Sequence, residues 1–144
     1  MRAASAWLKR MLWDFLPEPR IIHAVMLSAW LTIATIGAVT IATPPRSISS
    51  ELGPVMSLTW GCLLAIGGAL GTLGIASRFW WLERAGIWSA IAGMSIYLAT
   101  VAHLHFASGG ARLTQMGFIL LAIIFLLTRL LRIWGLHSDP RLWR

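Results

Sequence analysis

Four long apolar runs decide what this chain can fold into. They cover residues 21–42, 55–76, 85–107 and 113–131. Each of the first three carries about twenty uncharged residues, which at about 1.5 Å per residue cross the ~30 Å hydrocarbon layer of a bilayer. The fourth has sixteen uncharged residues between Arg112 and Arg129, so we expect the Arg129 side chain to extend toward the interface. The sequence predicts an all-α integral membrane bundle of four transmembrane helices.

The basic residues predict how these helices are oriented. Of the twelve Lys and Arg residues, four precede the first run, two separate the second from the third, and four lie from Arg129 onward. The opposite ends hold only Arg46 and Arg112. Because basic residues collect on the cytoplasmic side, we expect both termini and the middle connection to be cytoplasmic, in a bacterial cytoplasmic membrane. The first run is longer than the apolar part of a cleaved signal peptide, so we expect it to be retained.

Composition excludes most other classes. Hydrophobic residues make up 58% of the chain and charged residues 12%, against about 25% charged in soluble domains. The 144 residues form a single transmembrane domain with no room for a separate catalytic domain. The net charge of +7 lies at the ends of the runs, where cations meet phosphate headgroups. We therefore expect the lipid bilayer, and not nucleic acid, as the partner of these cations.

Residues 1–16 are predicted to form an amphipathic helix on the membrane surface. Their apolar side chains recur at helical spacing and form one stripe: Trp7, Leu8, Met11, Leu12, Phe15 and Leu16. Pro17 and Pro19 then end the helix. An anchor for the first span is the favoured interpretation, and a surface sensor or partner-binding arm is the alternative.

The connections between the runs also carry predictions. Residues 43–54 are rich in Pro and Ser and are expected to lack regular structure. Residues 77–84 are expected to lie at the cytoplasmic headgroup level, with Glu83 in a surface ion pair with Arg78 or Arg84 and not at depth. The residues predicted to lie at this interface, including a basic cap on the fourth run, are Trp80, Trp81, Glu83, Arg84, Arg129 and Arg132.

Small residues predict where the helices pack. In lipid, no hydrophobic force draws helices together, so small residues that allow close backbone approach are a main route to association. The second run contains a GxxxG pair, and the third offers a matching surface. The predicted packing residues are Gly67, Gly71, Gly74, Gly86, Ser89 and Gly93. Packing within one chain is favoured over self-association into a homo-oligomer, which stays open as the alternative.

No catalytic, cofactor or metal site is predicted. None of the five acidic residues lies well inside a run, so a carboxylate pair for hydrolysis or proton transfer is absent from the sequence pattern. His23 lies near the cytoplasmic start of the first run, whereas His103 and His105 lie near the outer end of the third, about 25 Å away along the membrane normal. These histidines are too far apart to share one metal ion or haem. We expect a protein that is not an enzyme.

Several sequence pieces together resemble a known group of proteins. They are Ser-Leu-Thr-Trp-Gly at 57–61, Trp-Trp-Leu-Glu-Arg-Ala-Gly-Ile at 80–87 and Arg-Ile-Trp-Gly-Leu-His-Ser-Asp-Pro at 132–140. With four spans, this arrangement is similar to the four-helix membrane proteins of lysis cassettes in phages of actinobacteria. The resemblance implies a holin or holin-associated protein, which assembles in the host membrane, alone or with another phage membrane protein, and forms or regulates lesions. Holins share a function and not one sequence family.

Two classes of function therefore remain open. The first is an oligomeric protein that forms or regulates membrane lesions. A single copy lacks a polar lumen, so conduction would need several copies with hydroxyl-bearing faces turned inward, at Thr32, Thr35, Thr40, Ser89 and Thr100. The second is an accessory subunit of a larger membrane complex, or a phage exclusion protein that alters the host envelope.

Overall fold

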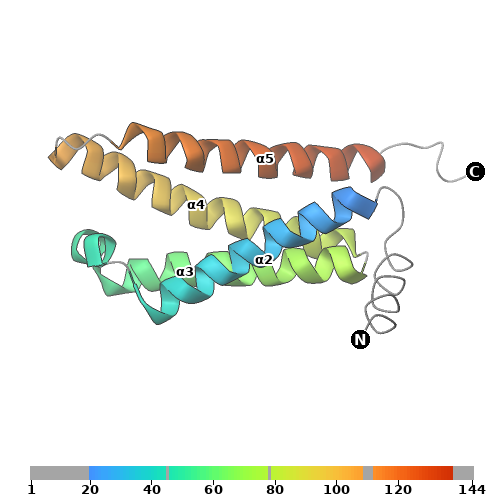
Figure 1. Cartoon of the computed structure of the whole chain (residues 1–144), viewed down its shortest axis with the longest axis horizontal. Coiled ribbons are helices and arrows are strands. Elements are labelled where there is room, and N and C mark those ends of the chain that lie inside the picture. The colour runs from blue at the N-terminus through green and yellow to red at the C-terminus, as the bar shows by residue number, and fades with distance from the viewer. Residues whose placement is uncertain (1–19, 45, 78, 109–111, 138–144) are drawn as a thin grey trace, which may run out of the picture.

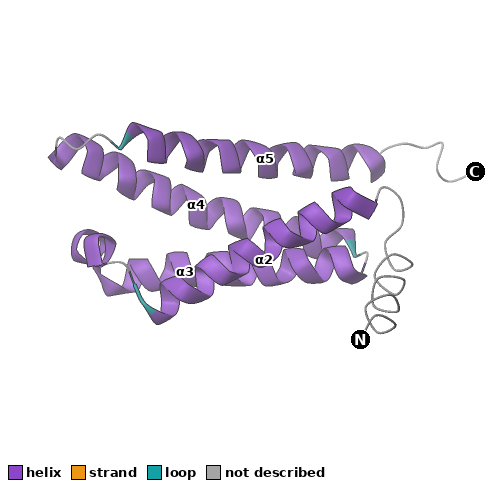
Figure 2. Ribbon diagram, viewed as in Figure 1, coloured by secondary structure: helices purple, strands orange, loops and turns teal. Residues whose placement is uncertain are grey.

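The structure, a computed structural model, describes residues 20–44, 46–77, 79–108 and 112–137. These residues form four α-helices: α2 (Arg20–Ala42), α3 (Arg46–Ser77), α4 (Trp80–Ser108) and α5 (Leu113–His137), and no strand occurs among them (Figures 1 and 2). Each helix contains a segment long and apolar enough to cross a membrane: Ile22–Ala42, Gly53–Ser77, Trp80–Ala107 and Leu113–Ile133. The prediction of an all-helical chain with four helices able to span a membrane is confirmed for the described residues, while the predicted surface helix 1–16 lies outside them.

Two helices begin earlier than the sequence predicts. Residues 46–52 are helical, so the expectation of an irregular loop from 43 to 54 is wrong for them. Gly53 separates this turn from the span with φ 76° and ψ 165°, a conformation that only glycine adopts without strain, and Pro54 follows at the start of the span. The α4 helix begins at Trp80 and not near residue 85, because the charged side chains of its first turns find partners within the bundle, as described below.

The α3 helix lies between two neighbours. It packs extensively against α2 on one side and α4 on the other, whereas α5 packs chiefly against α4 and over a smaller surface. In Figure 1 the start of α2, the start of α4 and the end of α5 lie at the same end of the bundle. This end carries Arg84, Arg129 and Arg132. We refer to it as the basic end.

Close backbone contact joins α3 to α4. A Cβ atom built on Gly67 would lie 2.8 Å from the Ala90 backbone nitrogen, and one built on Gly86 would lie 2.7 Å from the Gly67 carbonyl oxygen. Real Cβ atoms do not approach backbone so closely, so both positions require glycine in this packing. The Ser89 hydroxyl donates a 2.8 Å hydrogen bond to the Leu63 carbonyl across the same interface. Backbone proximity and one interhelical hydrogen bond therefore take the place of a hydrophobic driving force.

The α2–α3 contact uses glycines that the sequence analysis did not assign to it. A Cβ on Gly37 would lie 2.2 Å from the Ala65 nitrogen, and one on Gly68 would lie 2.3 Å from the Ala34 nitrogen. Gly71 faces the indole of Trp30, whose Cδ2 would lie 2.1 Å from an added Cβ. Trp30 is 2% exposed. The second run thus carries more glycines than one interface needs, because it packs against two helices.

Several threonine hydroxyl groups within the spans donate hydrogen bonds to helix carbonyls, whereas the buried Ser57 hydroxyl has no partner among the described residues. The Thr32 and Thr35 hydroxyls donate to the carbonyls of Ser28 and Leu31, one turn earlier in α2. Thr40 and Thr100 make the same bond in their own helices and are buried. Such bonds satisfy a hydroxyl where water is absent. In a single copy with this packing, these side chains do not form a polar lumen.

Replacing Gly67 with leucine should force α3 and α4 apart. Because overpacking a tight contact costs about 1 to 3 kcal/mol, we expect the free energy of unfolding to fall by that amount. The measurement is unfolding of the purified protein in mixed micelles with increasing denaturing detergent. Gly117→Leu is the matched control, since a Cβ on Gly117 of α5 would meet nothing within 4 Å. Equal stability of the two variants would contradict the packing described for α3 and α4.

Candidate functional site

A buried ion pair joins α4 to α5 at the basic end. The Arg129 Nε donates to Glu83 Oε1 at 2.7 Å and Nη2 donates to Oε2 at 3.1 Å, so the guanidinium and carboxylate meet in a bidentate arrangement. The side chains are 18% and 7% exposed, respectively. Both residues lie within segments that are apolar enough to span a membrane. Mutual neutralisation lowers the cost of burying two charged side chains between apolar helices.

The structure differs from the sequence prediction at Glu83. The expected arrangement was a surface ion pair with Arg78 or Arg84, but the recorded partner of the carboxylate is Arg129, and Glu83 is buried. The reason is the early start of α4, which places Glu83 inside the helix instead of in a connection. Arg129 correspondingly packs against the first turn of α4 at the basic end, with 18% of its side chain exposed.

Local sequence explains how Glu83 reaches this position. Gly74 of α3 faces the first turn of α4, and a Cβ there would lie 2.5 Å from the Glu83 backbone nitrogen. The missing side chain lets the start of α4 sit directly against α3. Glu83 is also the acidic residue of the first turn of α4, where the helix dipole favours negative charge. Gly74, predicted as a packing residue, therefore also positions the carboxylate.

The other residues predicted at the interface differ in exposure. Trp80 and Trp81 are exposed near the start of α4, where their indoles can reach the headgroup region. Arg84 is half-buried and takes part in an interaction within the protein. Arg132, one turn beyond Arg129, is exposed and has no ion pair with another described residue.

A second polar contact ties α5 to α4 near the opposite end. The Gln115 side-chain amide donates to the Tyr97 hydroxyl, and the Tyr97 ring stacks on Trp60 of α3 with centroids 4.6 Å apart and planes 6° apart. The sequence analysis did not pair Tyr97 with Trp60 or Gln115. These contacts come from three separate helices, so no local sequence signal reveals them.

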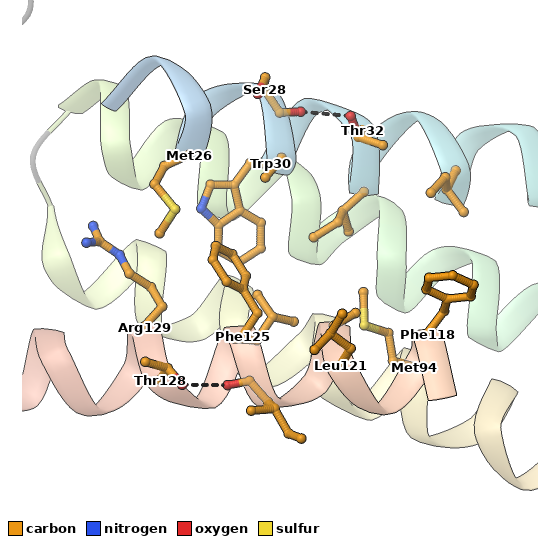
Figure 3. A pocket seen from close by; sticks show the side chains of 16 residues that line it. Met26, Ser28, Trp30, Thr32, Met94, Phe118, Leu121, Phe125, Thr128 and Arg129 are labelled. Atoms are coloured by element: carbon orange, nitrogen blue, oxygen red, sulfur yellow. Dashed lines mark hydrogen bonds between the residues drawn. The ribbon is translucent and has the colours of Figure 1, made fainter. Parts of the chain in front are cut away.

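A groove lies between α2 and α5, in the stretch of α5 that separates the Arg129–Glu83 ion pair from the Gln115–Tyr97 contact (Figure 3). Its main part has a volume of about 790 Å³ and continues into cavities of about 260 Å³ toward the basic end and about 220 Å³ in the other direction. We name the whole feature the α2–α5 groove. Figure 3 shows Met26 and Trp30 of α2 facing Leu121 and Phe125 of α5, with Arg129 at one end. The remaining described side chains that line the main part include Ile33, Ile36, Met94, Phe118, Ala122 and Thr128.

The side chains that line the α2–α5 groove are mostly apolar, so the groove suits an apolar ligand. The hydroxyls that line it, those of Ser28, Thr32 and Thr128, donate to backbone carbonyls of their own helices. The charged groups that line it, Arg129 and Arg132, lie at its basic end. The groove therefore has an apolar wall and one cationic end.

The histidines do not converge on this groove. The His105 Nδ1 accepts a 3.4 Å hydrogen bond from the Arg112 backbone nitrogen at the C-terminal end of α4, and His103 is exposed. His23 of α2 is half-buried, and its Nδ1 has no hydrogen-bond partner among the described residues. Within the described ranges, no three His, Cys, Asp or Glu side chains come together as a metal site would require.

Removing one member of the buried pair should destabilise the protein strongly. In Arg129→Met the Glu83 carboxylate stays buried without its partner, so we expect a loss of about 3 to 5 kcal/mol in the free energy of unfolding. The double variant Glu83→Gln/Arg129→Met removes both charges and should recover most of that loss. Arg132→Met, which removes an exposed arginine one turn away, is the control and should change stability little. Additive losses in the double variant would show that the pair is not coupled.

Comparison of the chain with protein-family models, with curated proteins and with solved structures finds no match.

Proposed function

We propose that this protein is a phage membrane protein of the holin type, which self-assembles in the cytoplasmic membrane of a bacterial host and forms or regulates lesions during lysis. The proposal draws on the four apolar helices, on the resemblance of the sequence to proteins of phage lysis cassettes, and on the lipid-facing surface of α5. The last of these carries the argument, because assembly needs a surface that one copy leaves uncovered.

The α5 helix has such a surface. Its buried residues Leu126, Leu130 and Ile133 face the core, so one side of the helix is attached to the bundle. Another face is exposed and follows alternating steps of four and three residues, the spacing that gives knobs-into-holes packing in left-handed helix pairs. This exposed stripe consists of Leu113, Gly117, Leu120, Ile124, Leu127 and Leu131.

The alternative route to assembly, through glycines, is less available. Gly67, Gly71, Gly74 and Gly86 are buried at contacts within one chain. A second copy would have to separate α3 from its neighbours to reach them. Self-association in the proposed function therefore uses the exposed stripe of α5, with several copies side by side.

We infer further that both termini are cytoplasmic. The ten-to-two distribution of basic residues supports this orientation, as does the meeting of Arg84, Arg129 and Arg132 at one end of the bundle.

A fluorescent protein that folds only in the cytoplasm, fused after residue 144, should fluoresce, while alkaline phosphatase fused there should be inactive. The same reporters inserted at residue 110 should give the opposite pattern. Phosphatase activity at residue 144 would reverse the orientation.

Inducing the protein alone in a bacterium should collapse the membrane potential above a threshold level, because lesions require several copies. Leu120→Ala/Leu127→Ala trims the exposed stripe without touching the core. We expect it to weaken association about tenfold, equivalent to roughly 1.4 kcal/mol, and to raise the threshold accordingly. The readouts are a potential-sensitive dye and the level of protein in the membrane.

The matched control is Leu31→Ala/Val39→Ala, which trims two exposed residues of α2 and should leave the threshold unchanged. If the wild-type protein reaches high levels with the membrane potential intact, alone and with neighbouring phage genes, lesion formation is wrong. An accessory subunit of a membrane complex, bound through the same stripe, then becomes the better interpretation.

A further inference from the structure

We propose that the α2–α5 groove binds one anionic phospholipid, with its phosphate headgroup at Arg132 and Arg129 and one acyl chain along the apolar wall. The inference depends on the membrane location of the chain and not on its role in lysis. It names the occupant of a groove that the bundle itself leaves open.

Charge identifies the headgroup. Arg132 is exposed and lines the basic end of the groove, with no ion pair to another described residue. Arg129 lies beside it and uses two of its five N–H donors on Glu83. Glu83 balances the charge of Arg129, so among the charged side chains that line the groove the uncompensated one is Arg132. A lipid whose phosphodiester gives it a net charge of −1, such as phosphatidylglycerol, complements this arrangement. Phosphatidylcholine carries the same phosphodiester but also a quaternary ammonium, which would bring a second positive charge to the arginines.

Length identifies the tail. Along α5, the groove runs from Arg129 to Phe118, eleven residues apart. At about 1.5 Å per residue this is roughly 16 Å. One leaflet supplies half of the ~30 Å hydrocarbon layer, which is about 15 Å. A groove of this length, with a cationic group at one end only, matches a single leaflet and not the whole bilayer.

The wall chemistry agrees with an acyl chain. Ile33, Ile36, Leu121 and Phe125 supply aliphatic and aromatic surface from both helices. The hydroxyls within the groove are bonded to helix carbonyls, as described above, so a chain without polar groups leaves none of them unsatisfied. The volume of about 790 Å³ also lies within the range of small-molecule sites, about 300 to 1,000 Å³.

The way α5 is attached leaves the separation between α2 and α5 free to adapt to a ligand. The ion pair at Glu83 and the Gln115–Tyr97 contact hold α5 to α4 near its two ends. Between them, α5 faces α2 across the groove instead of packing against it. A lipid chain that fills this space contacts both helices and should hold them at a fixed separation.

The test is native mass spectrometry of the full-length protein in micelles, titrated with phosphatidylglycerol or phosphatidylcholine of the same acyl chains. We expect one phosphatidylglycerol per chain, bound more tightly than phosphatidylcholine. Arg132→Gln should reduce that preference about fivefold. Arg112→Gln, which removes an arginine at the opposite end, should leave it unchanged.

A second pair of variants locates the acyl chain. Ala122→Trp and Ile36→Trp each fill the groove and should abolish tight binding of both lipids, while Leu31→Trp, on the exposed face of α2, should not. Helix content and melting are measured for every variant, and Arg132→Gln tests the site without altering the groove wall.

Three outcomes would overturn the proposal. Equal binding of the two lipids shows that no anionic headgroup site exists. Retention of tight lipid binding by both folded groove-filling variants shows that the chain lies elsewhere. Loss of protein dimers, with lipid binding intact, in the groove-filling variants shows that the groove holds a second copy. Lipid binding without lesions would leave this proposal standing while the proposed function fails.

Discussion

The bundle depends on the absence of side chains along α3. In hydrocarbon, apolar helices gain nothing from leaving solvent, so they associate where their backbones can approach. Gly67 provides that approach toward α4, and Gly68 provides it toward α2. These two adjacent residues contact different neighbours, so α3 is the central helix against which α2 and α4 pack. With α2, α3 and α4 in place, Gly74 also brings the start of α4 close enough for Glu83 to be buried.

The α5 helix follows a different rule. Its Gly117 faces open space and not a neighbouring helix, and its attachment combines a few buried aliphatic residues with a polar contact near each end. This division explains why the α2–α5 groove exists at all: bulky side chains such as Phe118 and Phe125 keep the two helices apart where glycines would let them meet. Small residues thus pack α2, α3 and α4 tightly, whereas large residues pack α5 loosely. The surfaces proposed to bind lipid and a second copy both include α5.

The sequence predicts the helices better than it predicts their contacts. Length and apolarity were enough to find four spans, because a bilayer sets the size of any element that crosses it. The start of α4 was misplaced because charged residues such as Glu83 were taken to mark a connection, and their partners cannot be seen from local sequence. Arg129 is forty-six residues away. The contact between Gly71 and Trp30 was missed for the same reason, since GxxxG spacing shows where a helix can be approached but not what approaches it.

The burial of Glu83 has a consequence for biosynthesis. Arg129 is made forty-six residues later, which at about 5 to 20 residues per second is a delay of roughly 2 to 9 s. During that interval the Glu83 carboxylate lacks the Arg129 partner that it has in the folded bundle. The first turn of α4 can therefore reach its buried position only after α5 has been made. Synthesis of α5 thus completes the packing of the helix before it.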